Sequence, residues 1–154
     1  MGIKTIVSNR RARHDYHVLE KHEAGIVLRG TEVKSLRAGQ MVLKDSYADI
    51  VGGEMYLIGA HINPYEQGTV WNHDPERQRK LLLHKREIER LGAQVAEKGL
   101  TLVPLSVYFK DGKAKVELGL CRGKQTIDKR RTIQEREVKR EMDRAVKSVR
   151  KGQD

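Results

Sequence analysis

The chain has 154 residues, with 31 Lys or Arg against 21 Asp or Glu and a formal net charge of +10. This length fits one domain with a modest extension, and no apolar run approaches the roughly 20 residues that cross a membrane. The single cysteine, Cys121, excludes an internal disulfide and predicts a reducing compartment. We therefore expect a cytoplasmic protein whose excess positive charge favours nucleic acid over an inert basic surface.

The first part of the chain alternates polar loops with short regular elements. Three arginines and a histidine crowd NRRARHDY (9–16), which we interpret as a basic loop or arm leading into a strand. EAGIVLRG (23–30) has apolar residues at alternate positions, the pattern of a strand. GTEVKSLRAG (30–39) begins at a glycine and offers Thr31 as an N-cap, which predicts a short helix.

Further along, glycines and prolines separate strands from one longer helix. DSYADIVGGEMYLIGAHI (45–62) predicts two strands joined at its paired glycines. The Pro, Gly and Asn content of residues 63–79 predicts a loop. KREIERLGAQVAEKG (85–99) has apolar residues at helical spacing and a glycine after its end, so it predicts a helix.

LTLVPLSVYFKDGKAKVELGLC (100–121) is the clearest hairpin, with Asp111-Gly112 as its turn. Each strand is expected to place alternate residues on one face: Val103, Leu105, Val107 and Phe109, then Val116, Leu118 and Leu120. About six short antiparallel strands with two inserted helices close most economically as a small barrel. We therefore predict a mainly β fold, an OB-like antiparallel barrel with inserted helices, over residues 1–122.

Residues 123–154 are predicted to form a separate basic tail. From residue 122 onwards there are twelve Lys or Arg against six Asp or Glu, and the apolar residues form only a thin helical stripe. Because an isolated helix of this length is marginal in water, we expect a tail that is disordered alone and helical on a partner. Folding would align Arg136, Arg140 and Arg144 on a basic stripe, and Gly123 is the expected hinge.

The six histidines raise an enzymatic alternative, a small hydrolase. His14 and His17 would point to opposite faces of a strand, and no pair of histidines joins a carboxylate on one helix face. Cys121 has no indicated His partner, so an inert cysteine is favoured over a nucleophile. We predict no enzymatic activity, no metal and no cofactor.

Three basic clusters outside the tail favour RNA. They are Arg10, Arg11 and Arg13; Lys34 and Arg37; and Arg77, Arg79, Lys80, Lys85 and Arg86. Taken singly, each cluster is equally well explained as a solvated face. Aromatic residues are few, which argues against single-strand binding by successive base stacking and suits a folded RNA read by shape and phosphate contacts.

Several longer motifs carry a specific resemblance. They stand in this order: NRRARHDY, EAGIVLRGTEVKSLRAG, LKDSYA, RKLLLHKREI, KGLTLVPLSVYFKDGKAKVELGL and GKQTIDKRRTIQERE. Together they resemble the SmpB family of SsrA-binding proteins over essentially the whole chain. The resemblance implies an OB-like barrel with inserted helices and a basic C-terminal tail.

The resemblance also implies a function. SmpB proteins bind the tRNA-like domain of transfer-messenger RNA (SsrA RNA) and deliver it to stalled bacterial ribosomes for trans-translation. The body stands in for the missing anticodon arm, and the tail enters the decoding centre of the small-subunit rRNA and the empty mRNA channel. Elongation factor Tu and alanyl-tRNA synthetase are implied as indirect partners through the RNA. We also expect a monomer.

Site residues carry over from the family motifs. For the RNA-facing body, the resemblance together with the first helical cluster gives Asn9, Arg11, Arg13, His14, Glu23, Gly25, Lys34, Leu82 and Lys115. For the ribosome-binding tail it gives Gly123, Lys124, Asp128, Lys129 and Arg130. Ile127, where the chain departs from the family pattern, is included with them, and the helical stripe adds Arg136, Arg140 and Arg144.

Three positions keep alternatives open. Glu23 would accept from base amino or 2′-hydroxyl groups, or form an ion pair with a nearby arginine. Leu82 would pack on an exposed base or belong to the core, with the core slightly favoured. Ile127 stands where family members often have His or Tyr, which puts stacking on a ribosomal base in doubt. A general ribosome-associated protein is the second hypothesis within RNA binding.

Overall fold

The computed structural model describes residues 2–65, 72–124 and 139–140. The chain divides into one compact unit over Met1–Gly123 and a second over Lys124–Asp154. In the second unit the described residues are Lys124 and the helical, exposed Lys139 and Arg140. The barrel and the candidate RNA-binding residues of the body all belong to the first unit.

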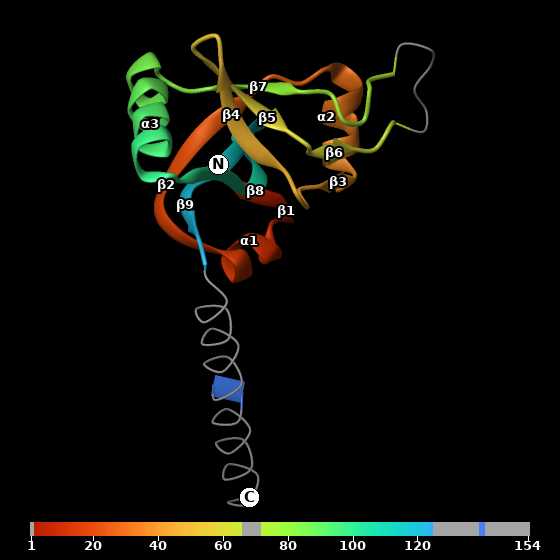
Figure 1. Cartoon of the computed structure of the whole chain (residues 1–154). Coiled ribbons are helices and arrows are strands. Elements are labelled where there is room, and N and C mark those ends of the chain that lie inside the picture. Colours follow the sequence, from red (N-terminus) through yellow and green to blue (C-terminus); the bar gives the residue numbers. More distant parts are fainter. Residues whose placement is uncertain (1, 66–71, 125–138, 141–154) are drawn as a thin grey trace, which may run out of the picture. The chain divides into compact units, whose positions relative to one another are not determined.

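In the described ranges, nine strands and three helices follow one another in the first unit (Figure 1). Their order is β1 (Ile3–Ser8), α1 (Arg10–Asp15), β2 (Tyr16–Ile26), α2 (Gly30–Arg37), β3 (Met41–Val42), β4 (Tyr47–Val51), β5 (Glu54–Ile58), β6 (His61–Ile62), β7 (Arg79–Leu82), α3 (Lys85–Lys98), β8 (Thr101–Lys110) and β9 (Lys113–Gly123).

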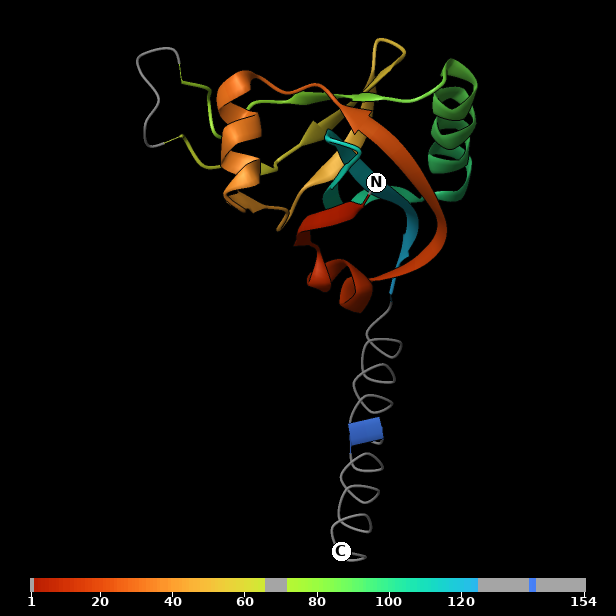
Figure 2. The ribbon, with the colours of Figure 1, turned by 180° about the vertical axis from the view of Figure 1, so that it is seen from behind.

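The main sheet closes into a barrel through β8. Its strand order is β1-β8-β4-β5-β7-β2-β9, and β8 also pairs with β9, so the antiparallel pairings from β8 to β9 form a closed ring to which β1 is added. On its other edge β8 pairs with β1 through its second half and meets β4 at Leu102. The predicted mainly β, antiparallel fold with inserted helices is confirmed. Figure 2 shows β2 running from α1 towards α2 beside β9.

The N-terminal region differs from the prediction of a basic loop. Residues 3–8 form β1, and residues 10–15 form the helix α1. Asn9 caps this helix because its Oδ1 accepts from the backbone N–H of Ala12 at 3.2 Å. Ala12 is buried in a small cluster with Val103, Leu105 and Cys121. The helix is missed in the sequence because one buried residue in a six-residue element leaves no periodic signal.

The β8–β9 hairpin forms as predicted, but the outgoing strand does not keep one face. A bulge lies between Pro104 and Ser106, so the residues before and after it point differently. Val103 and Leu105 belong to the small cluster under α1, whereas Val107 joins the main core. The return strand keeps its alternation, with Val116, Leu118 and Leu120 all in the main core.

The helices α2 and α3 form where predicted, but the N-cap of α2 is a different residue. Gly99 closes α3 in the left-handed conformation, at φ 62°, where glycine carries no Cβ penalty. Thr31 is not the N-cap of α2, because the cap is Arg29, whose backbone N–H donates to Glu32 Oε1 at 2.8 Å. The Thr31 hydroxyl instead lies 2.8 Å from Nδ1 of the buried His73.

Candidate nucleic-acid interface

Four of the predicted RNA-facing residues meet on one surface. Gly25 on β2 pairs with Leu82 on β7 and, on its other side, with Lys115 on β9. Glu23 lies two residues before Gly25, and all four line an open hollow of about 470 Å³. We call Glu23, Gly25, Leu82 and Lys115 the β2 patch. Residues distant in sequence are brought together here by the pairing of three strands.

The β2 patch combines an apolar side chain with charged neighbours. Leu82 is 52% exposed, so the interpretation of Leu82 as a core residue is wrong. Gly25 has no side chain and so leaves room for the Leu82 side chain, because a Cβ at Gly25 would lie only 3.2 Å from the Cβ of Leu82. An exposed leucine on the same surface as a carboxylate and an ammonium group suits an unstacked base, with polar groups placed to bind its edge or its backbone.

Glu23 is held by hydrogen bonds rather than by an arginine. The Tyr108 hydroxyl donates to Glu23 Oε2 at 2.5 Å, and Lys110 Nζ reaches the same oxygen at 3.4 Å. The hydrogen bond from Tyr108, followed by the charges of Lys110 and Lys115, lowers the pKa of Glu23 against the opposing effect of burial. Glu23 is therefore an ionised acceptor at neutral pH.

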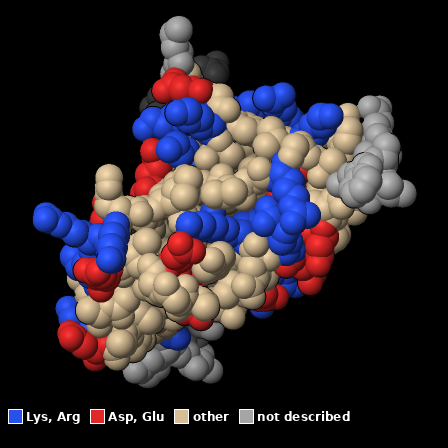
Figure 3. Space-filling model, turned by 90° about the horizontal axis from the view of Figure 1, so that it is seen from above, with Lys and Arg blue, Asp and Glu red and all other residues tan. Residues whose placement is uncertain are grey.

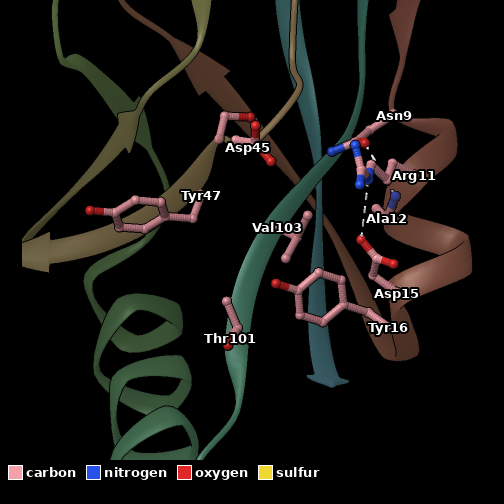
Figure 4. A pocket seen from close by; sticks show the side chains of 10 residues that line it. Asn9, Arg11, Ala12, Asp15, Tyr16, Asp45, Tyr47, Thr101 and Val103 are labelled. Atoms are coloured by element: carbon pink, nitrogen blue, oxygen red, sulfur yellow. Dashed lines mark hydrogen bonds and ion pairs between the residues drawn. The ribbon is translucent and has the colours of Figure 1, made fainter. Parts of the chain in front are cut away.

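The second group of predicted residues lies on and before α1. Asn9, Arg11 and Asp15 line an open hollow of about 280 Å³ together with residues of β2, β4 and β8, shown in Figure 4. Arg11 Nε lies 3.7 Å from Asp15 Oδ2, and His14 Nδ1 lies 2.9 Å from Asp15 Oδ1. The Arg11 side chain is 64% exposed and can still meet a phosphate.

Asn9 is used by the fold itself. Besides capping α1, it donates from Nδ2 to the carbonyl of Pro104 at 3.0 Å. Its backbone N–H donates to the carbonyl of Leu105 at 2.8 Å. These bonds fix α1, and with it the exposed Arg11 and Arg13, against β8. Asn9 thus holds α1 in the position that exposes these arginines.

The two groups lie near opposite ends of β2. Tyr16 follows α1 directly, and Gly25 is nine residues further along, which corresponds to roughly 30 Å along an extended strand. Figure 1 shows α1 and β7 at opposite ends of the barrel. Lys34 belongs to neither group, because it lies on α2 with its ammonium 5.3 Å from the centre of the Tyr65 ring. A ligand contacting both groups must therefore be large.

The basic cluster of residues 76–86 is partly neutralised by acidic residues of the protein itself. Arg79 is fully buried and donates to Glu32, which also accepts from Arg77. Lys80 pairs with Glu54 at 3.0 Å. Figure 3 shows Lys and Arg side chains spread over the face seen from above, with acidic side chains between them. The interpretation of Arg79 as part of a surface cluster is wrong.

Comparison with known proteins decides the family. The SmpB protein family model matches residues 6–148. The chain belongs to the SmpB family. An SsrA-binding protein of Pelotomaculum thermopropionicum is 56% identical over 147 residues, which cover 96% of each sequence. Another from Desulforudis audaxviator is 59% identical over 144 residues, or 94% of each.

A solved structure reported as "tmRNA-SmpB: a journey to the center of the bacterial ribosome" is similar to this SmpB-family chain in fold and sequence. The two are 59% identical, with a TM-score of 0.66. The match covers 78% of this chain and 85% of the other.

Most of the predicted tail residues lie outside the described ranges of this SmpB-family chain. Ile127, Asp128, Lys129, Arg130, Arg136 and Arg144 all do. Gly123 is the last residue of β9 and pairs with Tyr16. Arg140 is helical and exposed.

The histidine and cysteine chemistry weighed above finds no support in the part of the chain that the structure describes. No group of three or more His, Cys, Asp or Glu there has the placement to hold a metal ion. Cys121 is fully buried, and burial raises the pKa of its thiol to about 11, which disfavours the reactive thiolate. Among these residues no helix is long and apolar enough to span a membrane.

Several residues of the interface were missed in the sequence. Leu83, His84 and Glu87 line the same hollow as the β2 patch, and Tyr108 lies behind it. Tyr108 had a signal: the Asp111-Gly112 turn fixes the hairpin register, which puts Tyr108 opposite Lys115. Leu83, His84 and Glu87 lie at the junction of β7 and α3. The sequence alone did not show that this junction lies beside β2.

Proposed function

We propose that this chain binds the tRNA-like domain of transfer-messenger RNA and delivers it to stalled bacterial ribosomes for trans-translation. The proposal is supported by relatives named SsrA-binding proteins, 56% and 59% identical over nearly the full chain. It is also supported by the fold match to a chain described as part of tmRNA–SmpB in the bacterial ribosome. The function is binding and delivery, without catalysis.

The β2 patch is the structural observation that best supports the proposal. Four residues selected by family resemblance, and separated by up to 92 positions between Glu23 and Lys115, form one continuous surface. In this proposal Lys115 meets phosphate, Leu82 packs on an unstacked base, and Gly25 keeps the approach open. Glu23 accepts from a base amino or 2′-hydroxyl group, which adds specificity to the electrostatic attraction.

The second contact is assigned to α1 and the residue before it. Arg11, Arg13 and His14 would meet the RNA backbone while Asn9 holds the helix in place. A folded tRNA-like RNA is long enough to contact both ends of β2, whereas a short oligonucleotide is not. Lys34, on α2, is a third point of contact in the proposal.

The tail is proposed to act on the ribosome. It follows Gly123, the last residue of β9, and the basic residues from Lys124 onwards would enter the decoding centre and the empty mRNA channel as a helix. Elongation factor Tu and alanyl-tRNA synthetase would be met only through the RNA. The proposed setting is the bacterial cytoplasm, where translation takes place, and the protein is proposed to act as a monomer.

The RNA that copurifies with the protein tests the proposal. The full chain should be isolated from its own cells under gentle conditions, with sequencing of all bound RNA. Strong enrichment of transfer-messenger RNA over its share of total RNA is expected. A broad ribosomal RNA profile without that enrichment would favour a general ribosome-associated protein instead.

A further inference from the structure

A buried tyrosine lies directly behind the RNA-facing carboxylate of the β2 patch. Tyr108 is only 7% exposed, yet its hydroxyl reaches Glu23 Oε2 at 2.5 Å. Lys110, on the same strand, reaches the same oxygen at 3.4 Å. Both contacts end on Oε2, and within the described residues no hydrogen bond ends on Glu23 Oε1. One carboxylate oxygen is fixed by the protein, while the other has capacity for a ligand.

The charge of Glu23 is balanced by its neighbours in the fold. Glu23 lies directly opposite Glu117 on β9, and like charges at opposed positions of neighbouring strands are destabilising. Glu117 is relieved by Lys21 at 3.8 Å, and Glu23 by Tyr108 and Lys110. The net effect of these neighbours lowers the pKa of Glu23, so the fold keeps the carboxylate ionised. An ionised carboxylate held at Oε2 still offers Oε1 as an acceptor, whereas a glutamine whose oxygen accepts from Tyr108 would present an NH2 donor there.

We infer that Tyr108 is a positioning residue that holds Glu23 in the orientation required for RNA recognition. The inference rests on the proposed function, because it deepens the role of the β2 patch. Tyr108 is too buried to bind RNA itself. Its hydroxyl anchors Oε2, which restricts the rotation of the Glu23 side chain and directs Oε1 to a base amino or 2′-hydroxyl donor of the RNA. Preorganised acceptors lose less entropy on binding than mobile ones.

The chain contains a matched control for this arrangement. On β5, the Tyr56 hydroxyl donates to Glu54 Oε2 at 2.9 Å, and Lys80 reaches Glu54 Oε1 at 3.0 Å. This second Tyr–Glu–Lys set has the same chemistry and lies outside the β2 patch. Here both carboxylate oxygens are occupied, so neither is held open for a ligand. Loss of the Tyr56 hydroxyl should leave RNA binding unchanged.

The pH dependence of RNA affinity distinguishes a positioning role of Tyr108 from a purely structural one. The Tyr108 hydrogen bond is the largest cause of the lowered pKa of Glu23, so its loss raises that pKa towards the usual value. A protonated Glu23 is a poorer acceptor. In Tyr108→Phe, RNA affinity should therefore begin to fall at a higher pH than in the wild type as the solution is acidified.

The test is a double-mutant cycle on the full chain, with the isolated tRNA-like domain as the probe. At neutral pH, Tyr108→Phe should weaken binding roughly three- to tenfold in the Glu23 background and less than about twofold in Glu23→Gln. Tyr56→Phe is the matched control. Lys110→Met provides a second cycle at an exposed position, outside the core. Its effect on RNA affinity should also be smaller in the Glu23→Gln background.

The outcomes separate two failures. Should the wild type not bind the tRNA-like domain, the proposed function falls and the positioning role with it. In the second case the wild type binds, but Tyr108→Phe and Lys110→Met each lower RNA affinity by the same factor whether residue 23 is Glu or Gln. The proposed function then stands and the positioning role is refuted. An effect of Tyr56→Phe equal to that of Tyr108→Phe would likewise refute it.

Discussion

Glu32 and Arg79 form an ion pair in which both side chains are completely buried. Arg79 Nε donates to Glu32 Oε2 at 2.5 Å, joining α2 to β7. Arg79 also donates to the carbonyls of Ala60, Asp74 and Pro75, and Glu32 accepts from Arg77. The pair therefore anchors the start of β7, the strand that carries Leu82 into the β2 patch.

Breaking this pair should destabilise the fold strongly. Glu32→Gln or Arg79→Met leaves a buried group without its partner, which costs about 3–5 kcal/mol of unfolding free energy. Urea unfolding of each variant measures the loss. In the double variant the two losses should not add, since neither Glu32 nor Arg79 then remains without the other, and Arg77 loses its partner in Glu32→Gln already. A loss below about 1 kcal/mol for both single variants would show that the pair does not anchor β7.

The same pair predicts how stability depends on pH. Burial acts to raise the pKa of Glu32, but the hydrogen bonds from Arg77, the Arg29 backbone and Arg79 together outweigh it, so the pKa is lowered. A carboxyl group with a lowered folded pKa contributes stability above its unfolded pKa and loses it as the pH falls through the folded value.

Unfolding free energy should therefore fall as the solution is acidified below about pH 4.5, near the usual pKa of a glutamate. Glu32→Gln should show a flatter acid limb, because its amide does not titrate. Urea titrations at several pH values provide the comparison. Identical acid limbs in the two proteins would contradict the assigned lowering of the Glu32 pKa.

Leu82 should matter for RNA binding far more than for folding. Leu82→Ala removes a side chain that is 52% exposed, so stability should change by less than about 1 kcal/mol. Affinity for the tRNA-like domain should fall roughly tenfold, in line with the loss of a base–side chain contact. The control is Val51→Ala, at a 54% exposed position on β4 outside the β2 patch. Equal affinities for the two variants would remove Leu82 from the interface.

Truncation should separate the proposed tasks of body and tail. The described core lies within residues 1–123, so a chain ending at Gly123 should retain tight binding of the tRNA-like domain. It should fail to support tagging on stalled ribosomes, which a reconstituted translation system measures. A truncated body that no longer binds the RNA would show that the division of labour is wrong.

The elements with strong local signals were predictable from the sequence. Asp111-Gly112 defines the β8–β9 hairpin, and Gly99 ends α3, because both features depend on conformations that few residues adopt easily. The bulge after Pro104 was not predictable, since it depends on how β8 divides its side chains between two clusters. The charge of Arg79 suggested a surface residue, and only its tertiary partner Glu32 explains its burial.

The candidate site was predictable as a set of residues but not as a surface. Family motifs supplied Glu23, Leu82 and Lys115, whereas their adjacency depends on the pairing of β2 with both β7 and β9. Such pairings join distant segments and leave no local pattern. Tyr108 was missed although the hairpin register placed it opposite Lys115, because its contact with Glu23 crosses to a third strand.

The central claim is that the barrel recognises the tRNA-like domain of transfer-messenger RNA specifically. Its most direct test is the affinity of the full chain for that domain, measured against an ordinary tRNA of similar length at the same near-physiological salt concentration. The account predicts clearly tighter binding of the tRNA-like domain, with the preference reduced in Leu82→Ala and Glu23→Gln. Equal affinity for the two RNAs would contradict it, because electrostatic attraction alone would then account for the binding.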